Sequence, residues 1–297
     1  MSASHRARAA RPASAFRARA FAALQYLLPK RALSALVRAA TRVRTRWFKD
    51  LLIRWFLRRF AVDLADAALP DPFAYGCFNE FFTRALRSGA RPIASGPDEV
   101  ASPVDGTVSE CGAVDGDRLL QAKGRSYALR ELLADRDWSA GFEQGTFLTI
   151  YLAPRDYHRI HMPCDGQLLE TVFVPGRLFS VNAATARHVP RLFARNERVL
   201  TLFDGAAAGA FALVLVGALN VASIETVWAG EIVPGGRRGA VRLPHAPVAL
   251  RKGAECGRFN MGSTVILLFA PGRLVLSPTI AAGTPVRMGQ PIGRLTR

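Results

Sequence analysis

The sequence predicts an α+β protein in which a basic helical N-terminal region, residues 1–65, precedes one β-rich domain, residues 66–297, with a sandwich or barrel-like fold. Two observations predict this division. Up to residue 60, aromatic and aliphatic residues are interleaved with arginine, many at spacings of three, four and seven, which is helical periodicity. From residue 100 onward, short β-branched runs are separated by glycine and proline, which is typical of antiparallel sheets. With 297 residues, 50% of them hydrophobic, the chain can bury a sizeable core.

The N-terminal region carries most of the positive charge. The net charge of the chain is +17, and residues 1–60 hold fifteen Lys or Arg against a single acid, Asp50. A basic helix with Trp47 and Trp55 on its apolar face suits the membrane interface, where rings enter the acyl boundary while arginines reach lipid phosphates. We therefore expect an anionic membrane surface as a partner. A solvated face packed on the protein's own core is the alternative, and nucleic acid is not favoured because no nucleic-acid-binding motif accompanies the charge.

The first twenty residues contain arginine, alanine and serine without an acid, so two interpretations are open: a mitochondrial transit peptide or, as we favour, the basic tail of a bacterial protein. They lack the apolar segment of a secretory signal. Four widely spaced cysteines form no CxxC pair, which favours a reducing compartment. These cysteines are Cys77, Cys111, Cys164 and Cys256.

The β-rich region is predicted from its apolar runs. Residues 205–224 form a charge-free stretch, but its glycines and polar residues favour buried strands with a bend rather than a membrane span. One short helix is expected over residues 126–134. The expected strands cover residues 106–108, 147–152, 168–174, 199–203, 248–250, 265–269 and 274–276, with a further strand position at Val227.

Two of the five histidines, His158 and His161, lie three residues apart and close to Cys164. His-x-x-His-x-x-Cys offers three metal ligands, although no fourth is visible nearby. On an extended segment, residues three apart point to opposite faces, which suits two separate tasks better than one shared ion. Metal binding, a structural role and acid/base catalysis therefore all remain open from spacing alone.

Asp105 lies in a Ser-Pro-Val-Asp-Gly turn between two predicted strands. Asp-Gly is a common hairpin signal, so turn formation is the simpler explanation for this acid.

The pair Gly262-Ser263 precedes the apolar strand predicted from residue 265. A serine there can simply begin a strand, or it can be a nucleophile, because a glycine carbonyl is sterically open to an adjacent hydroxyl. An alcohol is almost wholly protonated at neutral pH, so attack requires a base such as a histidine oriented by a carboxylate.

Seven blocks, in order along about residues 24–291, resemble the bacterial, membrane-associated phosphatidylserine decarboxylase proenzyme family. The family's usual Leu-Gly-Ser-Thr motif has Met261 at its first place here, a conservative apolar change that leaves Gly262-Ser263 intact. The blocks cover residues 78–84, 102–106, 152–163, 174–182, 193–198, 224–230 and 257–264.

The resemblance implies a role for each residue of the site. Asp105, His161 and Ser263 would form a self-cleavage triad that cuts between Gly262 and Ser263. Ser263 would become a pyruvoyl group that forms a Schiff base with the substrate amine. His158 would position the substrate and deliver a proton, which suits a side chain whose ordinary pKa is about 6.5.

The same resemblance implies the products and partners. Cleavage would yield a β chain, residues 1–262, and an α chain, residues 263–297, which associate as a heterodimer that we expect to pair as a homodimer. The pyruvoyl group would replace pyridoxal phosphate as an electron sink, with no metal. The reaction would convert phosphatidylserine into phosphatidylethanolamine and carbon dioxide at the cytoplasmic face of the bacterial inner membrane, where a basic surface is attracted to the anionic substrate.

Three rival functions make distinct demands on the sequence. A biotinyl- or lipoyl-type carrier would need a lysine on a recognisable hairpin, which neither Lys123 nor Lys252 provides. A serine hydrolase with the same triad would keep its chain whole. A zinc protein using His158, His161 and Cys164 would bind stoichiometric metal.

Overall fold

The computed structural model describes residues 23, 25–26, 28–122, 125–219, 223–233 and 239–296, except for the side chains of residues 183 and 184. The expected basic tail lies outside these residues. The helices are α2 (Lys30–Thr41), α3 (Arg46–Phe60), α4 (Phe78–Phe82), α5 (Leu129–Leu132), η1 (Asp137–Phe142), α6 (Ala183–His188) and α7 (Leu192–Arg195). The strands are β1 (Glu99–Ala101), β2 (Gly106–Ala113), β3 (Arg118–Ala122), β4 (Arg125–Ala128), β5 (Thr146–Tyr151), β6 (Arg159–His161), β7 (Gly166–Val174), β8 (Arg198–Gly205), β9 (Gly209–Val216), β10 (Ile224–Thr226), β11 (Gly230–Ile232), β12 (Val241–Arg242), β13 (Ala249–Leu250), β14 (Glu255–Phe259), β15 (Thr264–Phe269), β16 (Leu274–Leu276), β17 (Pro285–Val286) and β18 (Pro291–Leu295).

A large antiparallel sheet forms the centre of the molecule, with the strand order β12-β7-β8-β9-β15-β5-β2-β17 and β13 beside β7. β15 pairs with β9 on one side and β5 on the other, so it is an inner strand. Its side chains alternate: Val265 and Leu267 join one core cluster, whereas Ile266 and Leu268 join another. Because both faces of this strand are buried, its sequence is a continuous apolar run rather than an alternating one.

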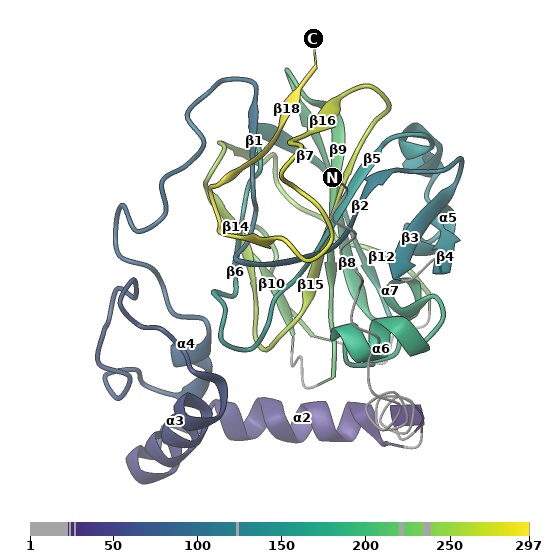
Figure 1. The fold of residues 1–297 in the computed structure, drawn as a ribbon. Helices are drawn as coiled ribbons and strands as arrows, with labels where there is room; N and C mark the ends of the chain where they lie inside the picture. The colour runs from purple at the N-terminus through teal and green to yellow at the C-terminus, as the bar shows by residue number, and fades with distance from the viewer. Residues whose placement is uncertain are drawn as a thin grey trace, which may run out of the picture.

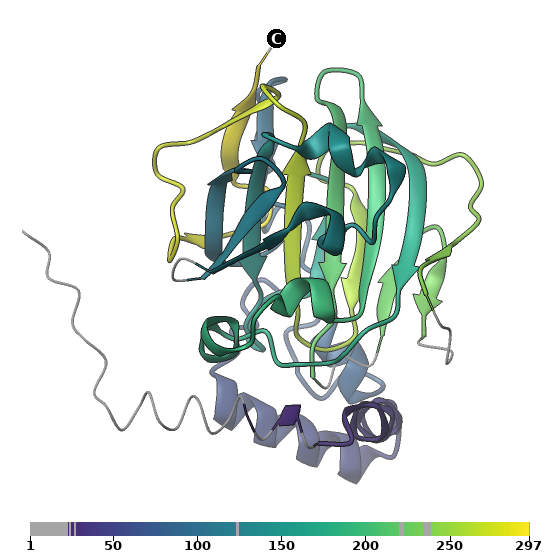
Figure 2. The ribbon, with the colours of Figure 1, turned by 90° about the vertical axis from the view of Figure 1, so that its right-hand side faces the viewer.

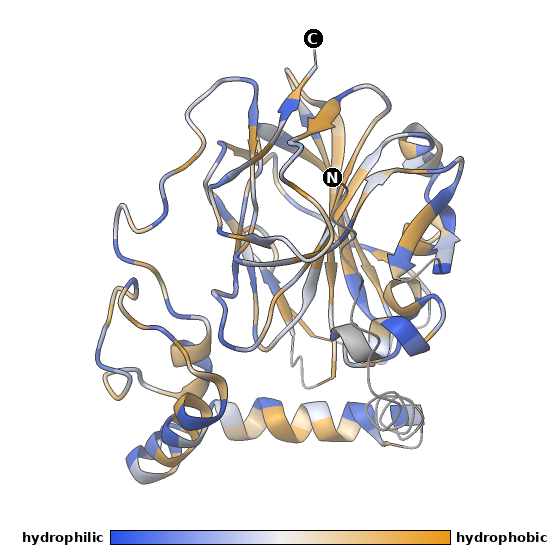
Figure 3. Cartoon of the chain, in the orientation of Figure 1, coloured by the Kyte–Doolittle hydropathy of each residue, from blue (hydrophilic) through white to orange (hydrophobic). Residues whose placement is uncertain are grey.

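Each face of the large sheet is covered by a different layer (Figures 1 and 2). The small sheets β1-β18-β16 and β11-β10-β14-β6 cover one face, and the β3-β4 hairpin with α5, α6 and α7 covers the other. The predicted α+β class is thereby confirmed, as stacked layers rather than a closed barrel. Figure 3 shows hydrophobic residues concentrated on the strands of the interior.

The helical N-terminal region is also confirmed. α2 lies across one end of the β-rich domain, with α3 and α4 at its side (Figure 1). Ile53 and Phe56 of α3 pack on phenylalanines of α4 in a separate aromatic cluster. Arg38 of α2 and Arg42, which directly follows the helix, form ion pairs with Glu231 of β11 at 3.0 and 2.5 Å. These ion pairs join the helix to the sheets.

Two local predictions differ from the structure. Of the helix expected over residues 126–134, only residues 129–132 are helical, because residues 125–128 pair with β3 as strand β4. Val227 lies in the turn after β10 rather than in a strand. In both cases pairing between strands outweighs local propensity. The charge-free stretch from residue 205 supplies β9 and the start of β10, as predicted.

Candidate active site

Gly262 and Ser263 lie in the connection between β14 and β15, immediately before β15 begins. The backbone carbonyl of Ser263 accepts a hydrogen bond from the amide of Leu152 at 3.0 Å, which fixes the serine beside the end of β5. The serine is fully buried, and its hydroxyl has no hydrogen-bond partner among the described residues. Because a buried hydroxyl without a partner is costly, this group is a candidate for a chemical rather than a structural role.

The residue before this pair has an unusual backbone. Met261 adopts φ 145°, in a region that residues with a side chain rarely occupy. Such a conformation typically costs roughly 1–3 kcal/mol and persists only where the surroundings enforce it. Backbone strain is therefore located next to the Gly262-Ser263 peptide.

His158 lies beside Gly262. A Cβ built on Gly262 would be 3.9 Å from His158 Nε2. The imidazole is fully buried, packs on the Phe82 ring at a centroid distance of 4.2 Å, and bonds through Nδ1 to the Asp156 carbonyl at 2.8 Å. Since a carbonyl only accepts, Nδ1 carries the proton and Nε2 presents a lone pair without a partner in the described part of the chain. Burial lowers the pKa of His158 to about 3, so the ring is neutral at pH 7.

His161 contacts different groups. Its Nδ1 bonds to the Gly253 carbonyl at 2.8 Å, and its Nε2 lies 2.9 Å from the Tyr157 hydroxyl. The first contact assigns the proton to Nδ1, so Tyr157 donates to Nε2. Burial lowers the pKa of His161, which makes it a neutral base near pH 7. The two histidines therefore contact different segments, as their spacing on an extended segment predicts.

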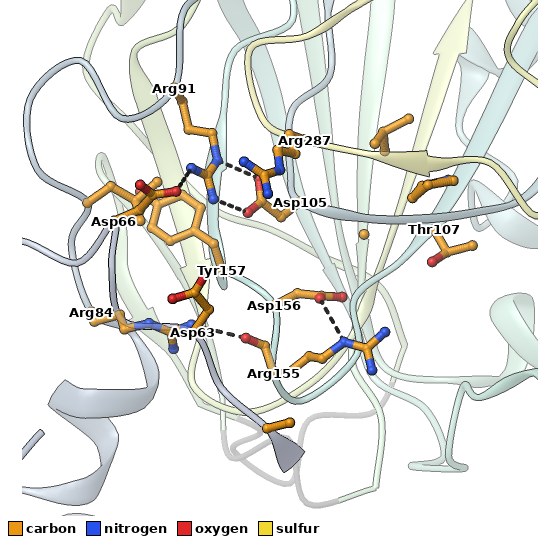
Figure 4. A pocket seen from close by; sticks show the side chains of 15 residues that line it. Asp63, Asp66, Arg84, Arg91, Asp105, Thr107, Arg155, Asp156, Tyr157 and Arg287 are labelled. Atoms are coloured by element: carbon orange, nitrogen blue, oxygen red, sulfur yellow. Dashed lines mark hydrogen bonds and ion pairs between the residues drawn. The ribbon is translucent and has the colours of Figure 1, made fainter. Parts of the chain in front are cut away.

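Asp105 is buried in an ion pair with Arg91. Arg91 donates from Nε at 3.1 Å and from Nη2 at 2.7 Å, and the amide of Met288 donates to Oδ1 at 2.7 Å. Arg91 also binds Asp66 at 2.5 Å. The two acids raise the pKa of Arg91 above its ordinary value, so the guanidinium remains charged. These side chains and Tyr157 line a cavity of about 290 Å³, in which they face one another (Figure 4).

The structure brings the predicted residues together in two groups. His158 lies beside Gly262 and Ser263. His161 instead lies beside the turn that carries Asp105, because its backbone amide donates to the Pro103 carbonyl at 2.8 Å. Within the described residues, Asp105 makes no hydrogen bond to His161. His161 Nδ1 instead donates its hydrogen bond to the Gly253 carbonyl, whereas in a Ser-His-Asp triad it would donate to a carboxylate.

Sequence reasoning missed a polar network beside the connection between β14 and β15. Asn260 donates to Ser223 Oγ at 2.8 Å, and Asn79 Nδ2 donates to Asn260 Oδ1 at 3.0 Å. Ser223 donates in turn to Glu231. Asn79 and Asn260 both lie in blocks that the resemblance singled out, but their contact spans 181 positions, so no local pattern signals it.

Metal ligation finds no geometric support in the described ranges. No group of three or more His, Cys, Asp or Glu side chains there is arranged to hold an ion. Cys164 is buried as a free thiol, and burial raises its pKa to about 12, which disfavours the thiolate that metals bind.

A buried serine, strained backbone at Met261 and a neutral His158 beside Gly262 suit a self-processing enzyme. Comparison with known proteins identifies which one. Residues 78–294 match the sequence model of the family described as Phosphatidylserine decarboxylase, and residues 20–61 match a second model, described as PSD. The chain belongs to the phosphatidylserine decarboxylase family.

Named relatives are similar in sequence to this chain over nearly its whole length. The phosphatidylserine decarboxylase proenzyme of Pseudomonas paraeruginosa is 53% identical over 280 residues, which covers 93% of this chain and 96% of the relative. That of Methylococcus capsulatus is 52% identical over 276 residues, covering 92% and 96%. That of Stutzerimonas stutzeri is 49% identical over 281 residues, covering 93% and 94%.

Proposed function

We propose that this chain cleaves itself between Gly262 and Ser263 and that the pyruvoyl group formed from Ser263 serves its decarboxylation reaction. Family membership makes the chain a self-processing carboxy-lyase that converts phosphatidylserine into phosphatidylethanolamine and carbon dioxide. The processed chains would be residues 1–262 and 263–297. The observation that carries this assignment is the fully buried Ser263 hydroxyl, which is unpartnered among the described residues and belongs to the residue directly after Gly262.

Self-cleavage begins when Ser263 Oγ attacks the carbonyl carbon of Gly262. The new C–O bond replaces the peptide C–N bond, so the acyl group moves from nitrogen to oxygen and forms an ester. A base then removes the α-proton of residue 263, the Cβ–Oγ bond breaks, and its electron pair leaves with the Gly262 carboxylate. Water hydrolyses the resulting dehydroalanine after tautomerisation, releasing ammonia and leaving a pyruvoyl group on the short chain. Strain at Met261 favours the first step, because breaking the peptide bond allows this backbone to relax.

Asp105, His161 and Ser263 are our proposed cleavage triad. His161 has a basic Nε2 and a lowered pKa, which supports its role as the proton acceptor. Asp105 belongs to the same electrostatic environment, since its charge acts to raise the pKa of His161 against the larger effect of burial. Reaching Ser263 requires His161 Nε2 to exchange its Tyr157 partner for the serine hydroxyl.

His158 is our proposed positioning and proton-transfer residue for decarboxylation. Its unpartnered Nε2 lies beside the peptide from which the pyruvoyl group would form, so the surroundings fit that group. Phe82 and the Asp156 carbonyl fix the ring. The pyruvoyl group supplies an electron sink for the pair left when carbon dioxide departs. His158 would hold or return a proton at this centre, and its burial excludes competing water.

The N-terminal helices are the proposed membrane-binding surface. Trp47, Leu51 and Trp55 of α3 lie at i, i+4 and i+8 and are 70%, 58% and 58% exposed. They form one apolar helical face beside arginines, which suits the interface of an anionic bilayer. Within the described ranges no helix combines the length and hydrophobicity needed to cross a bilayer. We place the enzyme peripherally on the cytoplasmic face of the bacterial inner membrane, as a homodimer of processed chain pairs.

The mass of the purified protein under denaturing conditions tests the cleavage assignment, with Ser263→Ala as the variant. Two chains that break at Gly262-Ser263, the shorter one blocked by pyruvoyl, are expected from the natural sequence. The variant is expected to remain whole. A single uncut chain from both proteins would overturn the proposal and favour a serine hydrolase.

A further inference from the structure

An open groove of about 920 Å³ lies between the start of α2, the loop after β7 and the end of α7. We call it the basic groove. Its polar wall consists of four cations, and its remaining wall is largely apolar, including Leu28, Pro29 and Leu178. The cations are Lys30, Arg31, Arg177 and Arg195. Among its lining residues there is no acid.

Two of these cations are held by aromatic rings rather than by carboxylates. Lys30 is only 7% exposed, and its Nζ lies 4.1 Å from the centroid of Phe179. Burial lowers the pKa of Lys30, and the charges of Arg177 and Arg195 lower it further. The Arg195 guanidinium stacks on Tyr26 and Phe179 at 5.5 and 5.2 Å. Like charges gathered in this way are unfavourable until an anion joins them.

Glu197 is an acid close to the cluster, since Arg31 acts electrostatically on its carboxyl. Glu197 follows the groove loop, and its backbone amide donates to the Arg177 carbonyl at 2.8 Å. Its side chain is 4% exposed, and burial raises its pKa to about 7, so a large share of this carboxyl is protonated near neutrality. The basic groove therefore retains a net positive charge.

We propose that the basic groove binds the phosphate of an anionic membrane phospholipid, outside the residues of the cleavage site. The cations match a phosphodiester, and the apolar wall matches the first part of its acyl chains. The groove begins on α2, one of the N-terminal helices proposed to contact the membrane, and this helix also carries the 67% exposed Leu36. This inference rests on the proposed membrane-surface function.

Calorimetric titration of the processed enzyme with dihexanoyl phosphatidylglycerol, kept below its micelle-forming concentration, tests the site. The groove variant is Arg31→Gln/Arg177→Gln, which removes two exposed cations from the groove. The control is Arg251→Gln/Arg273→Gln, which removes two exposed cations elsewhere. We expect the groove variant to bind the lipid about tenfold more weakly and the control to bind normally. Dihexanoyl phosphatidylcholine, which has no net charge, is expected to bind more weakly to the natural protein.

Equal lipid binding by the groove variant and the control would overturn the proposal. Inorganic phosphate binding as tightly as the lipid would also overturn it, because the site would then be one for a free anion. Two-chain mass spectra of both variants show that they fold and process. Binding of the natural protein to phosphatidylglycerol vesicles tests the membrane function separately. If vesicles bind but the short lipid does not, only the groove proposal fails.

Discussion

Asn260 donates a hydrogen bond from Nδ2 to Ser223 Oγ at 2.8 Å, two residues before Gly262. Ser223 donates in turn to Glu231, which accepts from Arg38 of α2 at 3.0 Å. Hydrogen bonds thus run without interruption from an N-terminal helix to the connection that holds Gly262 and Ser263. This connection is held from both sides, because Asn79 of α4 also bonds to Asn260.

Replacing Asn260 by alanine is therefore expected to slow self-cleavage. The variant loses two side-chain hydrogen bonds worth about 1 kcal/mol each, and the connection can then leave its reactive geometry. A roughly tenfold slower appearance of the two chains is expected when cleavage is followed by gel after expression is stopped. Gln121→Ala is the control, since it removes buried hydrogen bonds to residues 186–192. Equal slowing in both variants would mean that lost stability, not lost positioning, limits cleavage.

The sequence predicted the individual strands better than the pairing between them. Apolar runs located β5, β7, β8 and β15, because strands buried in the large sheet need continuous hydrophobic residues. The order β9-β15-β5 has no local signal, since it depends on pairing between segments distant in sequence. The Arg91–Asp105 ion pair is unpredicted for the same reason. A turn brackets Asp105 in sequence, but only the fold shows which cation it meets.

The two histidines should be separable by substitution. His161→Gln is expected to remain a single chain, because the proposed base for Ser263 is lost. His158→Gln is expected to yield two chains with decarboxylase activity reduced by about 100-fold or more, as for loss of a general acid or base. Chain mass and carbon dioxide release measure the two effects. An uncut His158→Gln chain beside a cut His161→Gln chain would instead assign the base to His158, the histidine nearer to Gly262.

Burial of His158 predicts that the protein becomes less stable as the pH is lowered. The unfolded chain protonates this histidine near its ordinary pKa of about 6.5, whereas the folded chain does so only near 3. Between these values the unfolded state binds more protons, so the free energy of unfolding decreases as pH falls, by up to about 1.4 kcal/mol per pH unit. In an uncut Ser263→Ala background, His158→Gln should flatten the dependence measured by urea unfolding between about pH 6 and 4. An unaltered slope in His158→Gln would contradict this account.

The exposed face of α3 predicts how the enzyme is held at its substrate. Trp47 and Trp55 are 70% and 58% exposed and are not among the buried residues of the aromatic cluster, which Trp55 touches only from outside, through Phe56 and Phe60 at ring distances of 6.5 and 6.2 Å. Replacing both by serine should therefore leave the fold intact. Each ring buried at the interface contributes on the order of 1–2 kcal/mol, so the double variant should bind phosphatidylglycerol vesicles at least tenfold more weakly in sedimentation. Leu120→Ser/Val275→Ser, which changes exposed apolar residues on β3 and β16, should bind normally. Because the substrate stays in the bilayer, the tryptophan variant should also lose activity on vesicles while retaining it in detergent micelles. Unchanged sedimentation would assign membrane binding to another surface.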